Sequence, residues 1–264
     1  MGDGRAGRRP LGRRDDLPLE GVHAPGPVPV PGRAGPAVGV LPDGVHRRDL
    51  RDLNLADGIG DHLVRIPNGV DAGWWANGEA GDVRERYELP AEADLAVFAG
   101  GLWEHKDVVT LVDALAELED IHLALAGGDQ GHRGAIEERI REHGLGDRVH
   151  LLGRIPREDL RSLYHAADVF ASASTNEGFG LVYLEAMACG LPVVAREVGV
   201  IPELVDAGAQ VLVADDAEGL ARSIETLRAG HGEENPSIAD RYDWERIVGR
   251  FEQLYADVAG EARR

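Results

Sequence analysis

The run EGFGLVYLEAMACGLPVV, residues 177–194, decides the fold of this chain more than any other stretch. Its opening EGFG loop leads directly into a helical pattern that carries Glu185 on the second turn. Gly178 and Gly180 have no Cβ, so their backbone N–H groups can approach a ligand closely. The helix that follows points its unpaired N–H groups, and the positive end of its dipole, at the same place. The run therefore predicts an anion site between two carboxylates, Glu177 and Glu185.

The spacing of the two carboxylates suits an extended ligand. From Gly180 to Glu185 a helix rises about 7 Å, at roughly 1.5 Å per residue. One carboxylate can then lie near a sugar while the other reaches a ribose on the far side of a diphosphate. The simpler alternative is a solvated glutamate at a helix start and a second one on the helix surface.

Around this run, short apolar segments alternate with helical ones. This alternation predicts an α/β fold of the Rossmann-like kind, a mostly parallel sheet with helices on both faces, because strands that are apolar throughout are covered on both sides. We expect strands at Leu95–Ala99, Ile121–Ala126, Val149–Leu152, Val169–Ala173, Pro192–Ala195 and Gln210–Val213. We expect helices at Val108–Leu118, Arg133–His143, Glu158–His165, Leu181–Ala188, Ile201–Ala207, Ala217–Ala229 and Trp244–Val258.

Lys106 is the only lysine among 28 basic residues. It follows the first apolar strand and stands at the start of an amphipathic helix, where an open α/β sheet presents ligands at the carboxyl ends of its strands. A compact ammonium at this position can neutralise a phosphate as a point charge. The alternative is a surface lysine that survives in an arginine-rich chain.

From about Leu63 to about Val258 the chain resembles the retaining glycosyltransferases of family 4, also called group 1, whose two-domain fold is known as GT-B. The run 177–194 resembles their E-x7-E signature, which implies that Glu177 lies beside the donor sugar and Glu185 binds the ribose hydroxyls. GGLWEHKD resembles their G-R-L-x-x-x-K-G element, which implies a catalytic role for Lys106 at the donor diphosphate. Gly101 stands where the family usually has arginine, so half of the expected charge clamp is absent.

The resemblance implies further contacts to a nucleotide at the ends of other strands. Gly128 belongs to a glycine–acid turn with Asp129, although Asp129 can equally cap the next helix. Arg154 and Ile155 belong to a turn that contacts the base through backbone groups, although Arg154 can equally cover the surface. With Glu177 and Lys106 as catalytic residues, the implied donor-binding residues are Glu185, Gly100, Gly101, Gly128, Arg154, Ile155, Gly178, Phe179, Gly180 and Leu181.

Composition limits the partners of this chain. A formal net charge of −19 argues against nucleic acid and against anionic membranes, which would repel it. The acidic, lysine-poor composition favours a high-salt cytoplasm, because a GC-rich genome explains the missing lysine but not the excess of acid. The single cysteine, Cys189, cannot form an internal disulfide and is expected in the core. Without a signal-peptide pattern or a long apolar run, we expect a cytoplasmic protein, with peripheral membrane contact through its acceptor left open.

The first fifty residues differ from the rest, because they hold 8 of the 14 prolines and show no helix or strand period. We expect a disordered or non-native segment at 1–43 and a junction at 44–71 that contains a short helix and then HLVRIPNGVD, a strand that leaves through a turn at Asn68-Gly69. The nucleotide-sugar-binding domain is expected at 72–243, and a crossover helix and tail at 244–264. The segment ahead of residue 63 is too short for the acceptor domain of the family, so an N-terminal domain is expected to be missing or separate.

The resemblance implies a retaining transfer of a sugar from a nucleoside-diphosphate sugar to a glycan, a lipid-linked acceptor or a small molecule. No metal or other cofactor is expected, since the histidines lack metal-ligand spacing and the nucleotide-sugar is itself the substrate. The alternative is a nucleotide-sugar-binding module without turnover, which the short N-terminal part and Gly101 both favour. A sugar-nucleotide epimerase shares the architecture, but no matching acid–base pair is evident.

Overall fold

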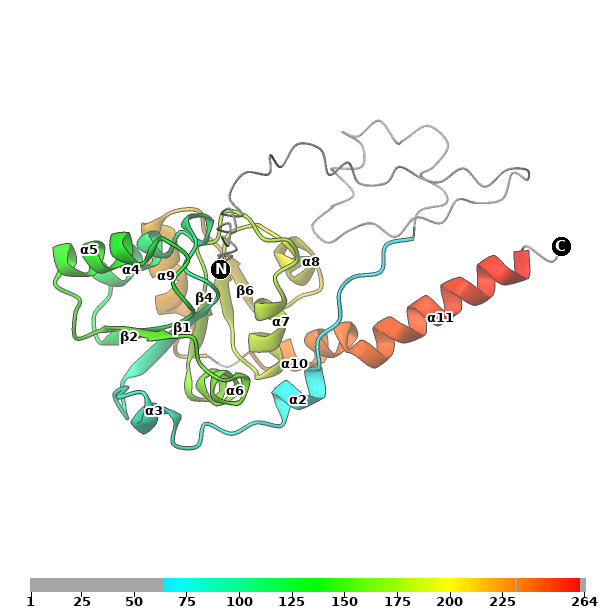
Figure 1. Ribbon diagram of the computed structural model, residues 1–264, viewed down its shortest axis with the longest axis horizontal. Coiled ribbons are helices and arrows are strands. Elements are labelled where there is room, and N and C mark those ends of the chain that lie inside the picture. Colours follow the sequence, from blue (N-terminus) through cyan, green and yellow to red (C-terminus); the bar gives the residue numbers. More distant parts are fainter. Residues whose placement is uncertain (1–63, 231, 262–264) are drawn as a thin grey trace, which may run out of the picture. The chain divides into compact units, whose positions relative to one another are not determined.

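The computed structural model describes residues 64–230 and 232–261. Its sheet consists of β1 (Asp94–Ala99), β2 (Ile121–Ala126), β3 (Val149–Gly153), β4 (Val169–Ala171), β5 (Val193–Ala195) and β6 (Val211–Val213). All neighbouring strands are parallel, and their order is β3-β2-β1-β4-β5-β6 (Figure 1). The order reverses between β1 and β4, which makes this pair the topological switch point of the sheet. The predicted Rossmann-like fold is confirmed.

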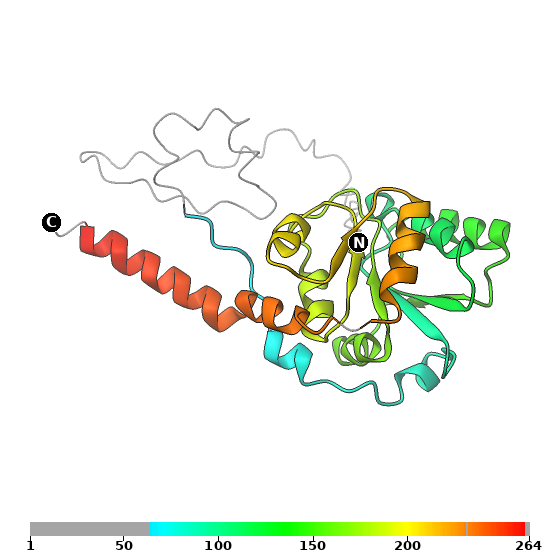
Figure 2. The same ribbon diagram turned by 180° about the vertical axis from the view of Figure 1, so that it is seen from behind.

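Helices cover both faces of the sheet. They are α2 (Ala72–Ala76), α3 (Val83–Arg86), the 3-10 helix η2 (Glu104–Lys106), α4 (Val108–Ala116), α5 (Arg133–His143), α6 (Arg157–Ala166), α7 (Leu181–Ala188), α8 (Ile201–Asp206), α9 (Ala217–Leu227), α10 (Asn235–Ala239), the 3-10 helix η3 (Asp240–Tyr242) and α11 (Trp244–Glu261). Helices α4, α5 and α9 pack on one face, and α6, α7 and α8 pack on the other (Figures 1 and 2).

The two faces of β1 show why its sequence is apolar throughout Leu95–Ala99. Leu95, Val97 and Ala99 point into the core formed with α6 and α7. Ala96 and Phe98 point into the core formed with α4 and α5. Because successive side chains of a strand alternate between faces, a strand covered on both sides needs apolar residues at every position. Each large side chain buried in this way contributes roughly 1.5–3 kcal/mol.

The predicted strand that leads to the turn at Asn68-Gly69 is wrong for its described part. Residues 64–69 form no strand, and Val70 makes an isolated bridge with Asp243. Pro67 cannot donate a hydrogen bond to a ladder. The backbone of Val70 instead accepts from Trp244 N at 3.1 Å and donates to Tyr242 O at 2.8 Å, which fixes this segment to the start of α11. Residues 62–63, the predicted helix ahead of them and the expected segment 1–43 lie outside the described residues.

Helix α11 is anchored mainly through its first turn. The indole of Trp244 fills the space beside Gly69, where a Cβ would lie 2.4 Å from the ring. Ile247 is the buried residue of the helix among positions 244–260. Val248 and Tyr255 remain 48% and 66% exposed, so much of the apolar stripe of α11 is not covered within the described structure.

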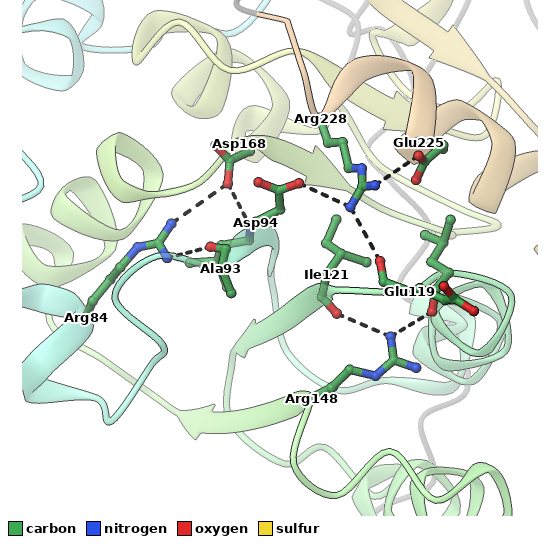
Figure 3. Close-up of polar contacts among 11 residues, drawn as sticks. Arg84, Ala93, Asp94, Glu119, Ile121, Arg148, Asp168, Glu225 and Arg228 are labelled. Atoms are coloured by element: carbon green, nitrogen blue, oxygen red, sulfur yellow. Dashed lines mark hydrogen bonds and ion pairs between the residues drawn. The ribbon is translucent and has the colours of Figure 1, made fainter.

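Arginines join the strand starts at the amino edge of the sheet. Arg228 of α9 pairs with Asp94 at 3.1 Å and with Glu225 at 2.9 Å (Figure 3). Arg148 donates to Leu118 O at 2.8 Å and to Ile121 O at 3.5 Å. This edge lies at the opposite end of the strands from the loops that carry Lys106 and Glu177, so it serves to hold the sheet together.

Candidate functional site

Lys106 and Glu177 meet at the switch point of the sheet. Lys106 lies in η2, after the carboxyl end of β1, and Glu177 lies in the loop after the carboxyl end of β4. The Lys106 Nζ atom is 2.7 Å from Glu177 Oε2, and the two side chains are only 15% and 9% exposed. Each charge is compensated by the other, which is what makes burial of either one tolerable. The structure thus brings together two residues that are 71 positions apart.

Hydrogen bonds tie the loops that carry these two residues. The carbonyl oxygen of His105 accepts from Thr175 N at 2.8 Å and from Thr175 Oγ1 at 3.1 Å. Arg196, after β5, pairs with Asp107 at 2.8 Å and donates to Ala173 O at 2.6 Å. The position of Lys106 is therefore fixed by contacts on both sides of it.

Two glycines allow the close approaches that the site requires. A Cβ on Gly127 would lie 1.7 Å from the carbonyl oxygen of Gly100, so the loops after β1 and β2 can meet only with glycine at this position. Gly180 begins α7 with a φ of 93°, and a Cβ there would lie 2.5 Å from the ring of Tyr183. Phe179 is buried and its carbonyl oxygen accepts from Val200 N at 2.8 Å, which anchors the EGFG loop.

The start of α7 provides hydrogen-bond donors beside Glu177. The backbone N–H groups of Leu181 and Val182 have no backbone acceptor among the described residues, as expected for the first turn of a helix. Leu181 is 37% exposed, so this helix end is open to solvent. Its donors and the dipole of α7 favour an anion at this position.

Glu185 lies half-buried on the second turn of α7. Burial raises the pKa of its carboxyl group to about 7, and the nearby guanidinium of Arg157 opposes this only in part. The carboxylate has no hydrogen-bond or ion-pair partner within residues 64–230 and 232–261, and no contact joins it to the pair Lys106–Glu177. Neighbouring Tyr164 has a buried hydroxyl that likewise lacks a partner among the described residues. The Glu185 carboxylate is therefore a polar group that a ligand can satisfy, whereas the Tyr164 hydroxyl is fully buried and out of a ligand's reach.

The structure places the other predicted residues as follows. Gly128 O accepts from Leu102 N at 2.9 Å, next to Gly100. Ile155 packs against the core of the α6–α8 face, whereas Arg154 is exposed and has no ion pair in the described part of the chain. Gly178 is exposed between Glu177 and the buried Phe179.

The space beside Gly101 is already occupied. A Cβ there would lie 3.0 Å from Gln130 Cγ and 3.0 Å from Trp103 Nε1. The indole of Trp103 is 47% exposed and stacks on His105, with ring centroids 6.2 Å apart. Side chains of a different kind therefore stand where the family resemblance led us to expect an arginine.

Asp129 organises its own turn. Its Oδ1 atom accepts from Gly131 N at 2.8 Å and from Arg133 N at 3.3 Å, and these backbone hydrogen bonds hold its pKa below the ordinary value. This geometry favours the local structural role over contact with a nucleotide.

Sequence reasoning missed several polar residues around the site. Arg157 lies near Glu185, and Tyr183 lies near Glu177. Arg196 pairs with Asp107. Tyr183 was hidden in an apolar helical run, and the partners of the two arginines come from elements distant in sequence, helix α7 for Arg157 and the loop after β1 for Arg196. No local pattern marks such contacts.

The described residues show no sign of a metal site or a membrane-spanning helix. They hold no group of three or more His, Cys, Asp or Glu side chains arranged for a metal ion. None of their helices combines the length and the apolar character needed to cross a membrane. Surface grooves of about 710 and 430 Å³ lie along α9, and neither is lined by Lys106 or Glu177.

The sheet order defines a Rossmann-like domain, and the paired charges at its switch point and the open start of α7 form a candidate anion site at the carboxyl ends of its strands. The family described as "Glycosyl transferases group 1" matches residues 81–243. The chain belongs to this family.

Curated relatives extend the comparison. D-inositol 3-phosphate glycosyltransferase of Corynebacterium jeikeium is 34% identical over 220 residues, which cover 75% of this chain and 52% of the relative. The protein of the same name from Xylanimonas cellulosilytica is 35% identical over 228 residues, covering 82% and 49%. The chain thus spans about half the length of these relatives.

Solved structures show the same fold. Sucrose-phosphate synthase from Thermosynechococcus elongatus superposes with a TM-score of 0.68 and 28% identity, covering 85% of this chain and 59% of that one. Anabaena HepE in complex with UDP-glucose superposes with a TM-score of 0.67 and 26% identity, covering 79% and 61%.

Proposed function

We propose that residues 72–243 form the donor-binding half of a retaining family 4 glycosyltransferase, which transfers a sugar from a nucleoside-diphosphate sugar to an acceptor. The observation that carries this proposal is the buried ion pair of Lys106 and Glu177 at the switch point of the sheet. A nucleotide-sugar suits such a pair, because its diphosphate offers negative charge to the cation and its sugar offers hydroxyl groups to the carboxylate.

Lys106 and the start of α7 bind the diphosphate. The ammonium and the N–H groups of Leu181 and Val182 stabilise the negative charge that builds up on the phosphate as the sugar–phosphate bond breaks. Glu177 lies beside the sugar and stabilises positive charge at its anomeric carbon. In a front-face reaction the departing phosphate helps take the proton of the acceptor, so no protein nucleophile is required.

Glu185 binds the ribose hydroxyls of the nucleotide. A half-buried carboxylate without a partner gains most from donors supplied by the ligand, and each such charge-assisted hydrogen bond contributes about 1.5–3 kcal/mol. The relative HepE was crystallised with UDP-glucose, so UDP is the first nucleotide to test.

The acceptor side of the reaction lies beyond this domain. The relatives are about twice as long as the matched region, which supports an acceptor-binding part outside residues 72–243, with α11 as its crossover helix. The acceptor is a glycan, a lipid-linked sugar or a small molecule, and the reaction takes place in the cytoplasm. The high acidic content supports a high-salt environment.

A nucleotide-sugar-binding module without turnover is the second candidate. Gly101 favours it, because the second cation expected at the diphosphate is replaced by the side chains of Trp103 and Gln130. Such a chain would bind the nucleotide-sugar but would not cleave the bond between the sugar and the nucleotide.

Calorimetry with UDP, GDP and ADP tests the proposal on the full chain of 264 residues. One nucleotide should bind, and Lys106→Ala and Glu185→Ala should each weaken it at least tenfold. Arg133→Ala is the matched control, since Arg133 pairs with Glu137 on the exposed surface of α5 and should leave the affinity unchanged. Unaltered affinity in Glu185→Ala would refute its role at the ribose. Release of UDP from UDP-glucose by the purified chain separates the enzyme from the binding module.

A further inference from the structure

Three buried hydroxyl groups form a chain behind Glu177. Tyr183 OH donates to Ser172 Oγ at 3.2 Å, and Ser172 Oγ lies 3.0 Å from Ser174 Oγ. All three residues are at most 1% exposed. Burying hydroxyls in an otherwise apolar core is unfavourable unless they are hydrogen-bonded, so a buried chain of this kind calls for a physical reason.

The chain lies near Glu177. Burial, and after it the negative charge of the nearby Glu177, raise the pKa of Tyr183 well above its ordinary value, while the hydroxyl itself donates to Ser172. Tyr183 therefore keeps its proton and has one O–H to donate. Its ring cannot turn away, since it fills the space beside Gly180 and packs edge-on against Phe170, with ring centroids 5.6 Å apart.

Glu177 thus has two candidate donors, Lys106 and Tyr183. In the described structure Lys106 holds Oε2 at 2.7 Å while Tyr183 donates to Ser172. A diphosphate would compete with Glu177 for the ammonium of Lys106. Without a replacement donor, the carboxylate of Glu177, which is 9% exposed, would be left buried and uncompensated.

We propose that Tyr183 is a positioning residue whose hydroxyl turns from Ser172 to Glu177 when Lys106 moves to the diphosphate of the donor. The proton remains on Tyr183 throughout, so only one hydrogen bond is exchanged for another. Ser172 keeps Ser174 as a partner, because Ser174 N donates to Ser172 Oγ at 3.3 Å. The exchange holds Glu177 ionised and in place beside the sugar, and it rests on the proposed function for the role of Lys106.

A double-mutant cycle tests this exchange without any nucleotide. Lys106→Met removes the ammonium but keeps an apolar stem, and Tyr183→Phe removes a single hydroxyl. Hydrogen bonds to charged groups are stronger than those between neutral groups. Tyr183→Phe should therefore raise the unfolding equilibrium constant in urea about tenfold more in the Lys106→Met background than in the wild type, a coupling of about 1.4 kcal/mol.

Tyr164→Phe is the matched control for this cycle. Tyr164 is equally buried, its hydroxyl has no partner in the described residues, and it lies on α6 rather than beside Glu177. Its effect should be the same with and without Lys106. Equal costs of Tyr183→Phe in both backgrounds would overturn the proposed exchange.

Binding of UDP supplies a second measurement with Lys106 intact. Tyr183→Phe should weaken UDP about tenfold in the wild type but less than twofold when Glu177→Gln has removed the charge that needs a donor. Equal weakening in both backgrounds would overturn the exchange while leaving the proposed function in place. If the wild type binds none of UDP, GDP and ADP, the proposed function itself fails.

Discussion

Replacing Glu185 by glutamine should make the protein more stable at neutral and alkaline pH. The pKa of its carboxyl group rises from 4.5 to about 7, chiefly because burial disfavours the charged form. Between these two values the folded protein holds a proton that the unfolded chain has released. The free energy of unfolding therefore falls as the pH rises through this interval and is constant above about 7.

The magnitude follows from the size of the rise in pKa. At 1.36 kcal/mol per pKa unit, a change from 4.5 to about 7 corresponds to roughly 3 kcal/mol. Glutamine carries no charge at any pH in this range. The free energy of unfolding of Glu185→Gln should therefore exceed that of the wild type by about 2–3 kcal/mol at pH 8, and the difference should shrink towards pH 4.5.

Urea unfolding followed by circular dichroism, at intervals from pH 4.5 to pH 9, measures this difference. Glu138→Gln, on the exposed face of α5, is the control and should show no comparable pH dependence. An offset of Glu185→Gln that stays constant with pH would refute the reasoning, because it would show that packing rather than ionisation causes the change. The same variant should bind nucleotide more weakly, so that stability and affinity change in opposite directions.

Two further predictions concern the framework around the site. Gly127→Ala should abolish soluble folded protein, because its Cβ would lie 1.7 Å from Gly100 O. Gly134→Ala, which has open space beside it in α5, is the control and should fold normally. A folded Gly127→Ala variant, as measured by circular dichroism, would contradict this prediction. Arg228→Met should lower the free energy of unfolding in urea by about 1 kcal/mol, since it removes the ion pairs with Asp94 and Glu225 at the amino edge of the sheet. A change below about 0.3 kcal/mol would show that solvent screens these ion pairs.

The strands and the longer helices could be predicted from sequence because burial on both faces leaves a simple pattern. The predicted strand over 121–126 and the helices over 133–143 and 181–188 agree with β2, α5 and α7 at both ends. The short helices α2 and α3 and the pairing of Val70 were not predicted, because they depend on partners distant in sequence. Trp75 of α2, for example, is buried against Tyr164 of α6, with ring centroids 5.5 Å apart.

In the site, too, features that depend on the local sequence could be predicted, and those that depend on long-range contacts could not. The open start of α7 follows from its own glycines, and the structure shows that Lys106 reaches Glu177. The roles of both residues stay predictions. Tyr183 and Arg196 could not be found from sequence, because a tyrosine in an apolar run and an arginine after a strand have many possible partners.

Two positions that depart from the family pattern both make the surroundings of Lys106 less positive. Gly101 removes a cation that the resemblance led us to expect, and a side chain at Asp107 adds a carboxylate where the motif ends in glycine. Asp107 adopts a left-handed conformation, with φ of 46°, which aspartate tolerates better than most residues.

Arg196 neutralises the added carboxylate of Asp107 and does not replace the missing cation at the position proposed for the diphosphate. Its guanidinium is occupied by Asp107 and by Ala173 O, so it offers little charge to a diphosphate. Lys106 is itself paired with Glu177. Under the proposed function, a diphosphate must compete with Glu177 for Lys106, and the donors at the start of α7 carry a larger share of binding than they would beside an additional arginine. On that proposal, the affinity for nucleotide depends on how readily Glu177 releases Lys106, which makes the surroundings of Glu177 as important as the cation itself.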